Sequence, residues 1–361
     1  MIETTLSLEP EKAEATPVIS YEVRPLTELS TAELDALRSL GAISPDAHPF
    51  QTPEFVTFAT ASPGHGPFAL LAASGDSLVG YWLGFFVRYR RLPWTLHLAM
   101  ARSGPVLQPD LPGGRRDSVL REFVLLLQRF ARQEGATRAV VTTETVYGER
   151  LDPPLRAASF ERRELATYLI DLRPPLDDIL RRVDRSARTG TRTSRRRGVS
   201  VVPAESSEEV QAFRRALART LRQGGLTIPL PSDYLDRLHR LRASSAAHVS
   251  VAKHDGRVIG GHLILSLGDP AIYYQAATSE RSLRSGDLLT WQCVEAAKEL
   301  GHEWLDMLSV EVDPPPNSRE AGIRRFKAKW GGSLVSTPVY AYRLPGPKAY
   351  GLLRGLARRL R

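Results

Sequence analysis

The sequence predicts a protein of mixed α/β (α+β) class in which one supersecondary unit occurs twice. A hairpin pattern, two apolar runs joined by a Gly-Asp or Asp-Gly turn, occurs at residues 68–87 and again at 248–267. A long amphipathic helix, a glycine stop and a buried strand follow at residues 117–143 and again at 285–308. Hairpins combined with one helix-linked strand predict two sheets that are mixed but mostly antiparallel.

The two copies of this unit align residue by residue. Three pairs correspond: Gly80 with Gly260, Ala72 with Ala252, and Gly135 with Gly301. A length of 361 residues also exceeds what one hydrophobic core usually serves. The sequence therefore predicts a tandem duplication with four segments: a disordered lead at 1–18, a first domain at 19–172, a second domain at 173–345 whose last strands return to the first, and a basic amphipathic helix at 346–361.

Charge and cysteine content limit the classes of partner and compartment. The net charge of +9 and the pI near 9.8 favour an anionic partner, such as nucleic acid, a phosphorylated substrate or a membrane surface. Cys293 is the single cysteine and lies in an apolar helical pattern, which excludes an internal disulfide and predicts a buried thiol. The sequence has neither a signal-peptide pattern at its start nor an apolar run long enough to span a bilayer, so we expect a cytoplasmic protein.

The common catalytic motifs do not occur in this chain. It contains no GxGxxG after a strand, no GxxxxGK[ST] and no GxSxG. Its eight histidines form no HxxxH or HExxH pair, so no metal site is predicted. Hydrolytic and metal-dependent chemistry are therefore disfavoured.

An arginine-rich segment lies at the boundary between the two copies. Residues 176–199 hold eight arginines; the first half reads as a helix that begins at Leu176, and Gly198 is the expected stop. A solvated basic surface explains this segment, and so does an element that faces phosphate groups.

Two further segments carry candidate site residues. In IYYQAATSERSLRSGDLL, Tyr273 and Tyr274 end a strand, and Arg281 and Arg284 precede a helix whose start could hold phosphate or could be a plain helix entry. In GIRRFKAKWGG (322–332), the bracketing glycines disfavour a helix. Lys327 there could stabilise the negative charge that develops in acyl transfer, or could be a solvated lysine beside a core Phe326.

The order of these segments resembles that of the FemABX family, the aminoacyl-tRNA-dependent peptidyltransferases built from two GNAT-like acyltransferase folds. The resemblance covers roughly residues 19–344 and rests on six features: HPFQTPEF, RSGPVL, SARTGTRTSRRRGVSV with Arg188 and Arg192 in register, IYYQAATSE, Asp306 at the end of the next strand, and GIRRFKAKWGG. GIRRFKAKWGG is similar to the family's Gly-x-x-x-Phe-Lys-x-x-Phe-Gly signature, with Trp330 as the second aromatic.

The resemblance implies an enzyme that transfers an amino acid from aminoacyl-tRNA to an amine of a peptidoglycan precursor or a related cell-envelope acceptor. No further cofactor is implied, because the tRNA ester is the activated donor. The implied site residues fall into three groups: catalytic Lys327, Phe326 and Glu144; substrate-binding Tyr273, Tyr274, Asp306 and Tyr234; and tRNA-binding Arg188, Arg192, Arg281 and Arg284.

Two other functions remain open at the level of the sequence. One is a CoA-dependent GNAT N-acyltransferase for an amino sugar or another small amine; it needs a pyrophosphate loop of the form Arg/Gln-x-x-Gly-x-Gly/Ala, which RSLRSGDLL offers only at a different spacing. The other is a binding protein for RNA or membranes. The stripe of leucines against arginines in 346–361 predicts peripheral contact with an anionic membrane, at the inner face of the cell membrane, or packing against the first domain.

Overall fold

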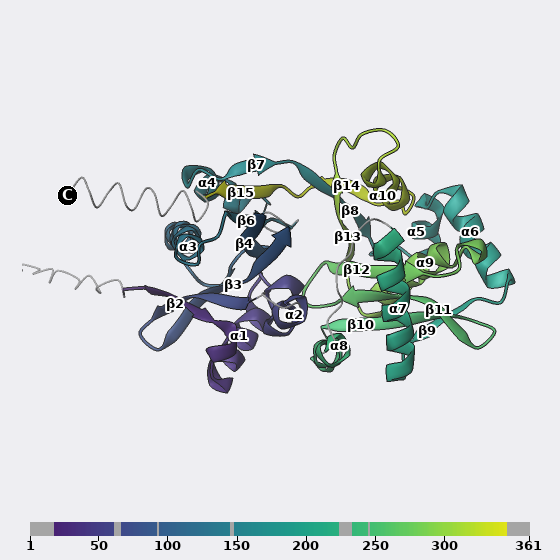
Figure 1. The fold of residues 1–361 in the computed structure, drawn as a ribbon, viewed down its shortest axis with the longest axis horizontal. Helices are drawn as coiled ribbons and strands as arrows, with labels where there is room; N and C mark the ends of the chain where they lie inside the picture. Colours follow the sequence, from purple (N-terminus) through teal and green to yellow (C-terminus); the bar gives the residue numbers. More distant parts are fainter. Residues whose placement is uncertain are drawn as a thin grey trace, which may run out of the picture.

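The computed structural model describes residues 18–60, 66–91, 94–144, 148–223, 233–244 and 246–344. The expected disordered lead, apart from Val18, and the expected C-terminal helix lie outside these residues. Within them the chain forms two sheets of mixed α/β class, which confirms the predicted fold class (Figure 1).

The first sheet contains, in spatial order, β1 (Ser20–Pro25), β2 (Gly66–Ser74), β3 (Ser77–Arg91), β4 (Trp94–Arg102), β6 (Arg138–Thr142), β15 (Val339–Arg343) and β7 (Glu161–Arg163), with β5 (Val106–Leu107) paired to β3. The second sheet contains, in spatial order, β9 (Ser200–Pro203), β10 (Ala247–His254), β11 (Arg257–Leu265), β12 (Ala271–Thr278), β13 (Trp304–Glu311), β8 (Leu165–Asp171) and β14 (Ser333–Ser336). Read side by side, the two orders place equivalent strands at equivalent positions.

The duplication is visible in the hydrogen-bond register. Ala72 pairs with Gly80 in the β2–β3 hairpin, and Ala252 pairs with Gly260 in the β10–β11 hairpin. Each pair is followed at once by a β-bulge. A Cβ on Gly80 would lie 2.5 Å from Leu107 Cδ2 and 3.0 Å from the Val106 carbonyl oxygen, so a side chain here would force its neighbours to shift. The repeat aligned from the sequence is therefore confirmed.

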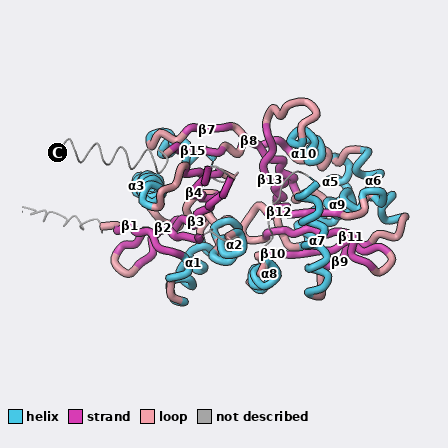
Figure 2. Tube along the Cα trace, in the orientation of Figure 1, coloured by secondary structure: helices cyan, strands magenta, loops and turns pink. Residues whose placement is uncertain are grey.

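The helices lie on both faces of each sheet (Figure 2). In the first half they are α1 (Thr31–Ile43), α2 (Pro53–Ala59), α3 (Gly113–Gln133) and α4 (Gly148–Ala157). In the second half they are α5 (Leu176–Arg182), α6 (Arg185–Arg196), α7 (Ser207–Gln223), α8 (Tyr234–Ala243), α9 (Ser285–Glu299) and α10 (Arg319–Ala328). Short 3-10 turns occupy Leu26–Glu28, Pro49–Gln51 and Arg281–Leu283. Gly135 and Gly301 follow α3 and α9 with φ of 64° and 86°, as the predicted helix stops require.

Two expectations about local structure need correction. The segment around Lys327 is helical: Ser318 caps α10 by accepting a hydrogen bond of 3.1 Å from the Ala321 N–H, and this cap outweighs the cost of Gly322. The strand β8, assigned from the sequence to the first domain, lies in the second sheet, while β15 returns to the first.

These two exchanged strands belong to one continuous ribbon. The β7–β8 segment runs antiparallel to β14–β15 with an unbroken register, from Ser333 opposite Leu169 to Ala341 opposite Glu161. The Thr337 N–H donates to the Leu165 carbonyl oxygen at 2.8 Å between the two sheets. Figure 1 shows this ribbon crossing from one half to the other. Each half thus completes its sheet with a strand from beyond its own copy of the repeat.

A shared hydrophobic core also joins the halves. Buried side chains of α1 and α2 cluster with those of α7 and α8, among them Phe55, Phe58, Phe213 and Tyr234. The ring of Tyr274 on β12 lies 5.5 Å from that of Phe55. The two halves are therefore packed against each other, which fixes the groups that face their junction.

Candidate active site

The first half contributes Glu144, which lies two residues after the end of β6. The residue is 5% exposed, and its Oε1 accepts a hydrogen bond of 3.2 Å from Thr142 Oγ1. Oε2 has no hydrogen-bond partner among the described residues. Burial raises the pKa of Glu144 to about 7, with Arg102 opposing the rise and Asp306 of the other half adding to it. A buried carboxyl with this pKa can exchange a proton near neutral pH.

Arg102, the last residue of β4, lies beside Glu144. Its Nη2 is 3.4 Å from Glu144 Oε1, and its guanidinium group stacks 3.7 Å from the centroid of the Phe50 ring. His48 is buried next to Phe50 and accepts the Phe50 N–H on Nδ1 at 3.2 Å. Burial, with a smaller effect of Arg102, lowers the pKa of His48 to about 3, so this ring is neutral. The Arg102 guanidinium group and the neutral His48 ring are thus held in fixed orientations.

The second half contributes Asp306, in the middle of β13. A β-bulge between Asp306 and Ser309 places Leu308 in the left-handed region, with φ of 63°. The Leu308 N–H donates to Asp306 Oδ1 at 2.6 Å, and Thr167 of the exchanged strand β8 donates to the same oxygen. Burial raises the pKa of Asp306, while these hydrogen bonds and the charges of Lys327 and Arg102 oppose the rise.

Lys327 projects from α10 toward the same bulge. Its Nζ donates to the carbonyl oxygens of Leu308 at 2.9 Å and Ser309 at 3.1 Å. An ammonium group has three donors, so one remains for another partner. Burial lowers the pKa of Lys327 to about 8, and Asp306 opposes that shift. The ammonium form is therefore retained at neutral pH in a largely water-free position.

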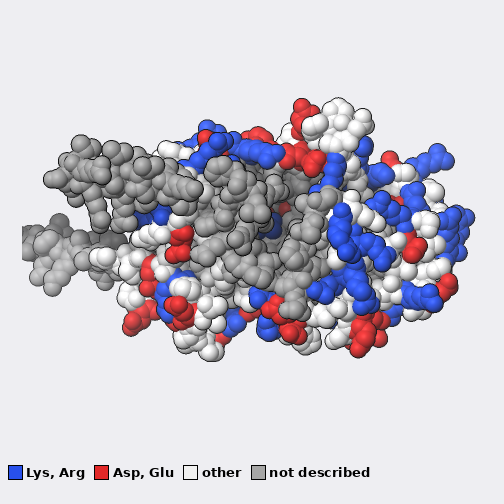
Figure 3. All heavy atoms as spheres, viewed as in Figure 1, with Lys and Arg blue, Asp and Glu red and all other residues white. Residues whose placement is uncertain are grey.

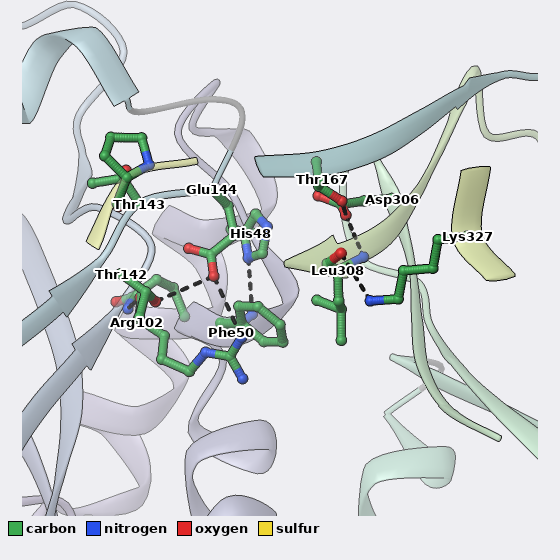
Figure 4. A network of polar contacts seen from close by, with 12 residues as sticks. His48, Phe50, Arg102, Thr142, Thr143, Glu144, Thr167, Asp306, Leu308 and Lys327 are labelled. Atoms are coloured by element: carbon green, nitrogen blue, oxygen red, sulfur yellow. Dashed lines mark hydrogen bonds and ion pairs between the residues drawn. The ribbon is translucent and has the colours of Figure 1, made fainter. Parts of the chain in front are cut away.

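The four side chains form two pairs that face each other across the junction between the halves. Figure 4 shows Glu144 and Arg102 on one side and Asp306 and Lys327 on the other. The Arg102 charge lowers the pKa of Asp306, and Asp306 raises that of Glu144, so the four side chains share one electrostatic environment. Of the residues predicted from the sequence, Glu144, Asp306 and Lys327 are brought together here.

The predicted tyrosines are divided between this junction and the cores. Tyr273, predicted to bind substrate, lies in the core beneath α9, where its hydroxyl is 3.1 Å from Thr290 Oγ1, so it does not face the junction. Tyr274 points the other way, against Phe50, Phe55 and Phe58 of the first half. Its alternation with Tyr273 follows from the period of two in a strand.

Two other aromatic residues predicted from the sequence lie on helices of the second half. Tyr234 is buried at the start of α8 and donates to Gln275 Oε1 at 3.0 Å. Phe326 is half-buried and packs edge-on against Trp330, with ring centroids 6.2 Å apart. Phe326 therefore fixes α10, the helix that carries Lys327.

The four predicted phosphate-binding arginines lie elsewhere, around α6 and the start of α9, at the end of the second half remote from the first (Figure 1). Arg192 is exposed and Arg188 half-exposed on α6. Arg281 lies 3.4 Å from Gln223 Oε1, and Arg284 is paired with Asp287 at 2.7 Å and donates to the Ser186 carbonyl oxygen at 3.2 Å. Figure 3 shows lysine and arginine side chains gathering over this half.

Sequence reasoning missed Arg102, His48 and Thr167. Arg102 ends a strand before the Ser-Gly-Pro turn of RSGPVL, and this position at a strand end was a usable signal. Thr167 lies inside the apolar run ATYLIDL, and only the exchange of β8 into the second sheet brings it to Asp306.

Comparisons with known proteins agree with this architecture. Residues 180–314 match the family model described as an acetyltransferase (GNAT) domain. None of the curated proteins matches the chain significantly. A crystal structure of FemX is similar with a TM-score of 0.67 and 16% identity, covering 90% of this chain and 97% of FemX.

Two other solved structures resemble the whole chain. The C-terminal domain of a putative lysylphosphatidylglycerol synthetase from Agrobacterium fabrum has a TM-score of 0.58 and 15% identity, covering 90% of this chain and 95% of that one. A tandem GNAT protein from the clavulanic acid biosynthesis pathway has a TM-score of 0.52 and 14% identity, covering 91% and 100%. Residues 180–314 are therefore similar to an acetyltransferase (GNAT) domain, and about nine-tenths of the chain shares the fold of FemX and of a tandem GNAT protein.

Proposed function

We propose that this protein transfers an aminoacyl group from aminoacyl-tRNA to an amine, and that the acceptor is a peptidoglycan precursor or a related component of the cell envelope. The observation that carries the proposal is the opposition of Glu144 and Lys327 across the junction of a FemX-like fold. One group has a pKa near 7 and the other near 8, and the two come from different halves of the chain. Such a pair supplies a base and a cation to one reacting centre.

The reaction needs little besides positioning, because an aminoacyl ester is already activated. The acceptor nitrogen attacks the ester carbonyl carbon, so a C–N bond forms and the ester C–O bond breaks. Glu144 takes a proton from the attacking amine, and that proton passes to the ribose oxygen, which leaves as a hydroxyl group. The Lys327 ammonium stabilises the negative charge on the carbonyl oxygen through its remaining donor.

The reaction belongs in the cytoplasm, where charged tRNA is present, and a lipid-linked acceptor would be met at the inner face of the membrane. The described residues contain no helix that is both long and apolar enough to cross a bilayer. Contact between residues 346–361 and an anionic membrane therefore stays a prediction of the sequence.

The start of α9 disfavours the alternative donor, acyl-CoA. That donor needs an open helix start to hold its pyrophosphate, but here the Asp287 carboxylate already occupies the first turn and binds Arg284. Helix α6 covers it so closely that a Cβ on Gly190 would lie 1.9 Å from Asp287 Oδ2. These contacts favour a donor that needs no pyrophosphate site in the second half.

A donor competition experiment tests the proposal. Purified protein is incubated with amine acceptors and either a pool of isotopically labelled aminoacyl-tRNAs or a pool of acyl-CoAs, and products are identified by mass spectrometry. We expect an aminoacyl amide only with tRNA, loss of at least about a hundredfold in Lys327→Ala and Glu144→Gln, and near-normal transfer in the neighbouring control Lys329→Ala. Acyl transfer from CoA with none from tRNA would overturn the choice of donor.

A further inference from the structure

Arg102 has more hydrogen-bonding capacity than its neighbours use. A guanidinium group carries five N–H donors, but among the described residues the side chain of Arg102 has one acceptor, Glu144 Oε1, at the long distance of 3.4 Å. Its side chain is 21% exposed, and the stacking contact with Phe50 fixes the plane of the group. The cation is thus rigid, oriented and incompletely paired.

Arg116 shows what a structural arginine of similar exposure looks like in this chain. Its side chain is 16% exposed; its Nη1 lies 2.8 Å from Asp46 Oδ2, and its Nη2 donates to the Gln108 carbonyl oxygen at 3.4 Å. Asp46 is fully buried and accepts from Arg150 as well. Among the described residues, Arg102 has no acceptor at so short a distance, which leaves most of its N–H donors for another partner.

Two buried polar atoms near Arg102, one a donor and the other an acceptor, also lack partners among the described residues. His48 accepts the Phe50 N–H on Nδ1, so its neutral ring carries the proton on Nε2, a buried donor without a partner among the described residues. Glu144 Oε2 is a buried acceptor, also without one. Donors on Arg102 and His48 match a carboxylate or phosphate, whereas the Glu144 acceptor matches an amine.

We propose that Arg102 binds an anionic group, a carboxylate or a phosphate, on the acceptor whose amine is placed at Glu144. This inference rests on the proposed aminoacyl transfer and adds the class of acceptor: an amine that carries its own negative charge close to the nucleophile. Arg102 is then a specificity-determining residue, because it selects among amines without taking part in the bond changes. The planar guanidinium group suits either anion, since it binds both with two parallel N–H bonds.

The test compares matched acceptors with the full chain and the labelled aminoacyl-tRNA pool. L-Lysine against cadaverine differs by a carboxylate, and glucosamine 6-phosphate against glucosamine differs by a phosphate. We expect the wild type to favour the anionic member of at least one pair by roughly tenfold or more in kcat/KM. The pair that shows the preference identifies which anion Arg102 binds.

Variants separate recognition from catalysis. In Arg102→Met we expect that preference ratio to fall to about one, chiefly through KM for the anionic member, with a partial return in Arg102→Lys. Arg129→Met, an exposed arginine on α3, is the matched control and should keep the wild-type ratio. A change in the basicity of Glu144 affects both members of a pair equally, so it leaves the ratio of their kcat/KM values unchanged. A ratio near one in the wild type, or one unchanged in Arg102→Met, would overturn the proposal.

Failure of the proposed function is distinguishable from failure of this inference. If no acceptor is consumed with any donor, isothermal titration calorimetry of the same four amines against the full chain decides. Tighter binding of an anionic member, lost in Arg102→Met and kept in Arg129→Met, supports the anion site even then. Equal binding within each pair rejects it.

Discussion

The hydroxyl group of Thr143 donates a hydrogen bond of 2.7 Å to the carbonyl oxygen of Pro338, although 195 positions separate them in the chain. Pro338 lies in the ribbon that exchanges strands between the halves, and Thr143 precedes Glu144 directly. The same ribbon carries Thr167, which binds Asp306. One two-stranded element therefore positions a carboxyl group from each half, and this explains why they meet at the junction.

The activity should depend on pH with two limbs. Glu144 acts as a base only when ionised, so kcat/KM should rise as the pH passes about 7. Lys327 stabilises the oxyanion only when protonated, so kcat/KM should fall as the pH passes about 8. A pH profile of transfer from aminoacyl-tRNA measures both. The residual activity of Glu144→Gln should lack the acid limb, and an unchanged limb in that variant would reject Glu144 as the base.

The free energy of unfolding should also depend on pH through the protonation of Glu144. The pKa of Glu144 is raised from 4.5 to about 7 on folding, so the folded chain binds the proton more tightly than the unfolded chain does. The resulting contribution to the free energy of unfolding is complete below pH 4.5 and is lost as the pH rises through 7. The shift corresponds to about 3 kcal/mol. Urea unfolding at pH 5 and pH 8 should therefore show a smaller fall in Glu144→Gln than in the wild type. Equal falls in the two proteins would contradict the buried, proton-binding carboxyl.

Thr167→Val should lower both stability and activity without creating a cavity in the core. The change keeps the shape of the side chain but removes a donor to the buried carboxyl of Asp306, at a cost of about 1–3 kcal/mol. We expect a lower free energy of unfolding and about tenfold slower transfer, because the loop that carries Lys327's acceptors is held by Asp306. Thr189→Val on the exposed face of α6 is the control and should change stability by less than about 0.5 kcal/mol. Indistinguishable behaviour of the two variants would show that Thr167 positions nothing.

Gly190→Ala should disturb the packing of α6 on α9. The added Cβ would lie 1.9 Å from Asp287 Oδ2 and 2.7 Å from Arg284 Nη2, so the side chains of this ion pair must rearrange, at a cost of about 1 kcal/mol. Gly286→Ala is the matched control, because its nearest neighbour would be 3.9 Å away. Thermal unfolding of both variants measures the difference. A Gly190→Ala protein as stable as Gly286→Ala would mean that the Asp287–Arg284 ion pair rearranges without cost.

Binding of tRNA should depend on the exposed arginines of α6. We expect Arg192→Ala to weaken binding and to reduce the slope of log K against log salt by about one, as the loss of one phosphate contact does. Arg284→Met should leave that slope nearly unchanged, since its guanidinium group is bound to Asp287. Filter binding with total tRNA between 50 and 200 mM salt, a range in which such contacts change affinity steeply, measures both. A larger effect from Arg284 than from Arg192 would place the phosphate contacts at α9 instead.

Local patterns determined much of this protein. The Ala72–Gly80 and Ala252–Gly260 pairs predicted both hairpins and the duplication, because a strand reports its pairing through period-two patterns and its turns through glycine and aspartate. Glu144, Asp306 and Lys327 could be selected from the sequence because the resemblance to the FemABX family implies a role for each of them.

Tertiary structure decided the rest. The sequence order predicts Leu165–Asp171 as a strand of the first half, and only its pairing with Trp304–Glu311 and Ser333–Ser336 assigns it to the second sheet. Tyr273 and Tyr274 are equal candidates in the sequence, but one faces α9 and the other faces the first half. Arg102 is one of many arginines until Phe50 stacks on it and Glu144 lies beside it. Contacts between distant segments leave no local pattern, so these assignments required the folded chain.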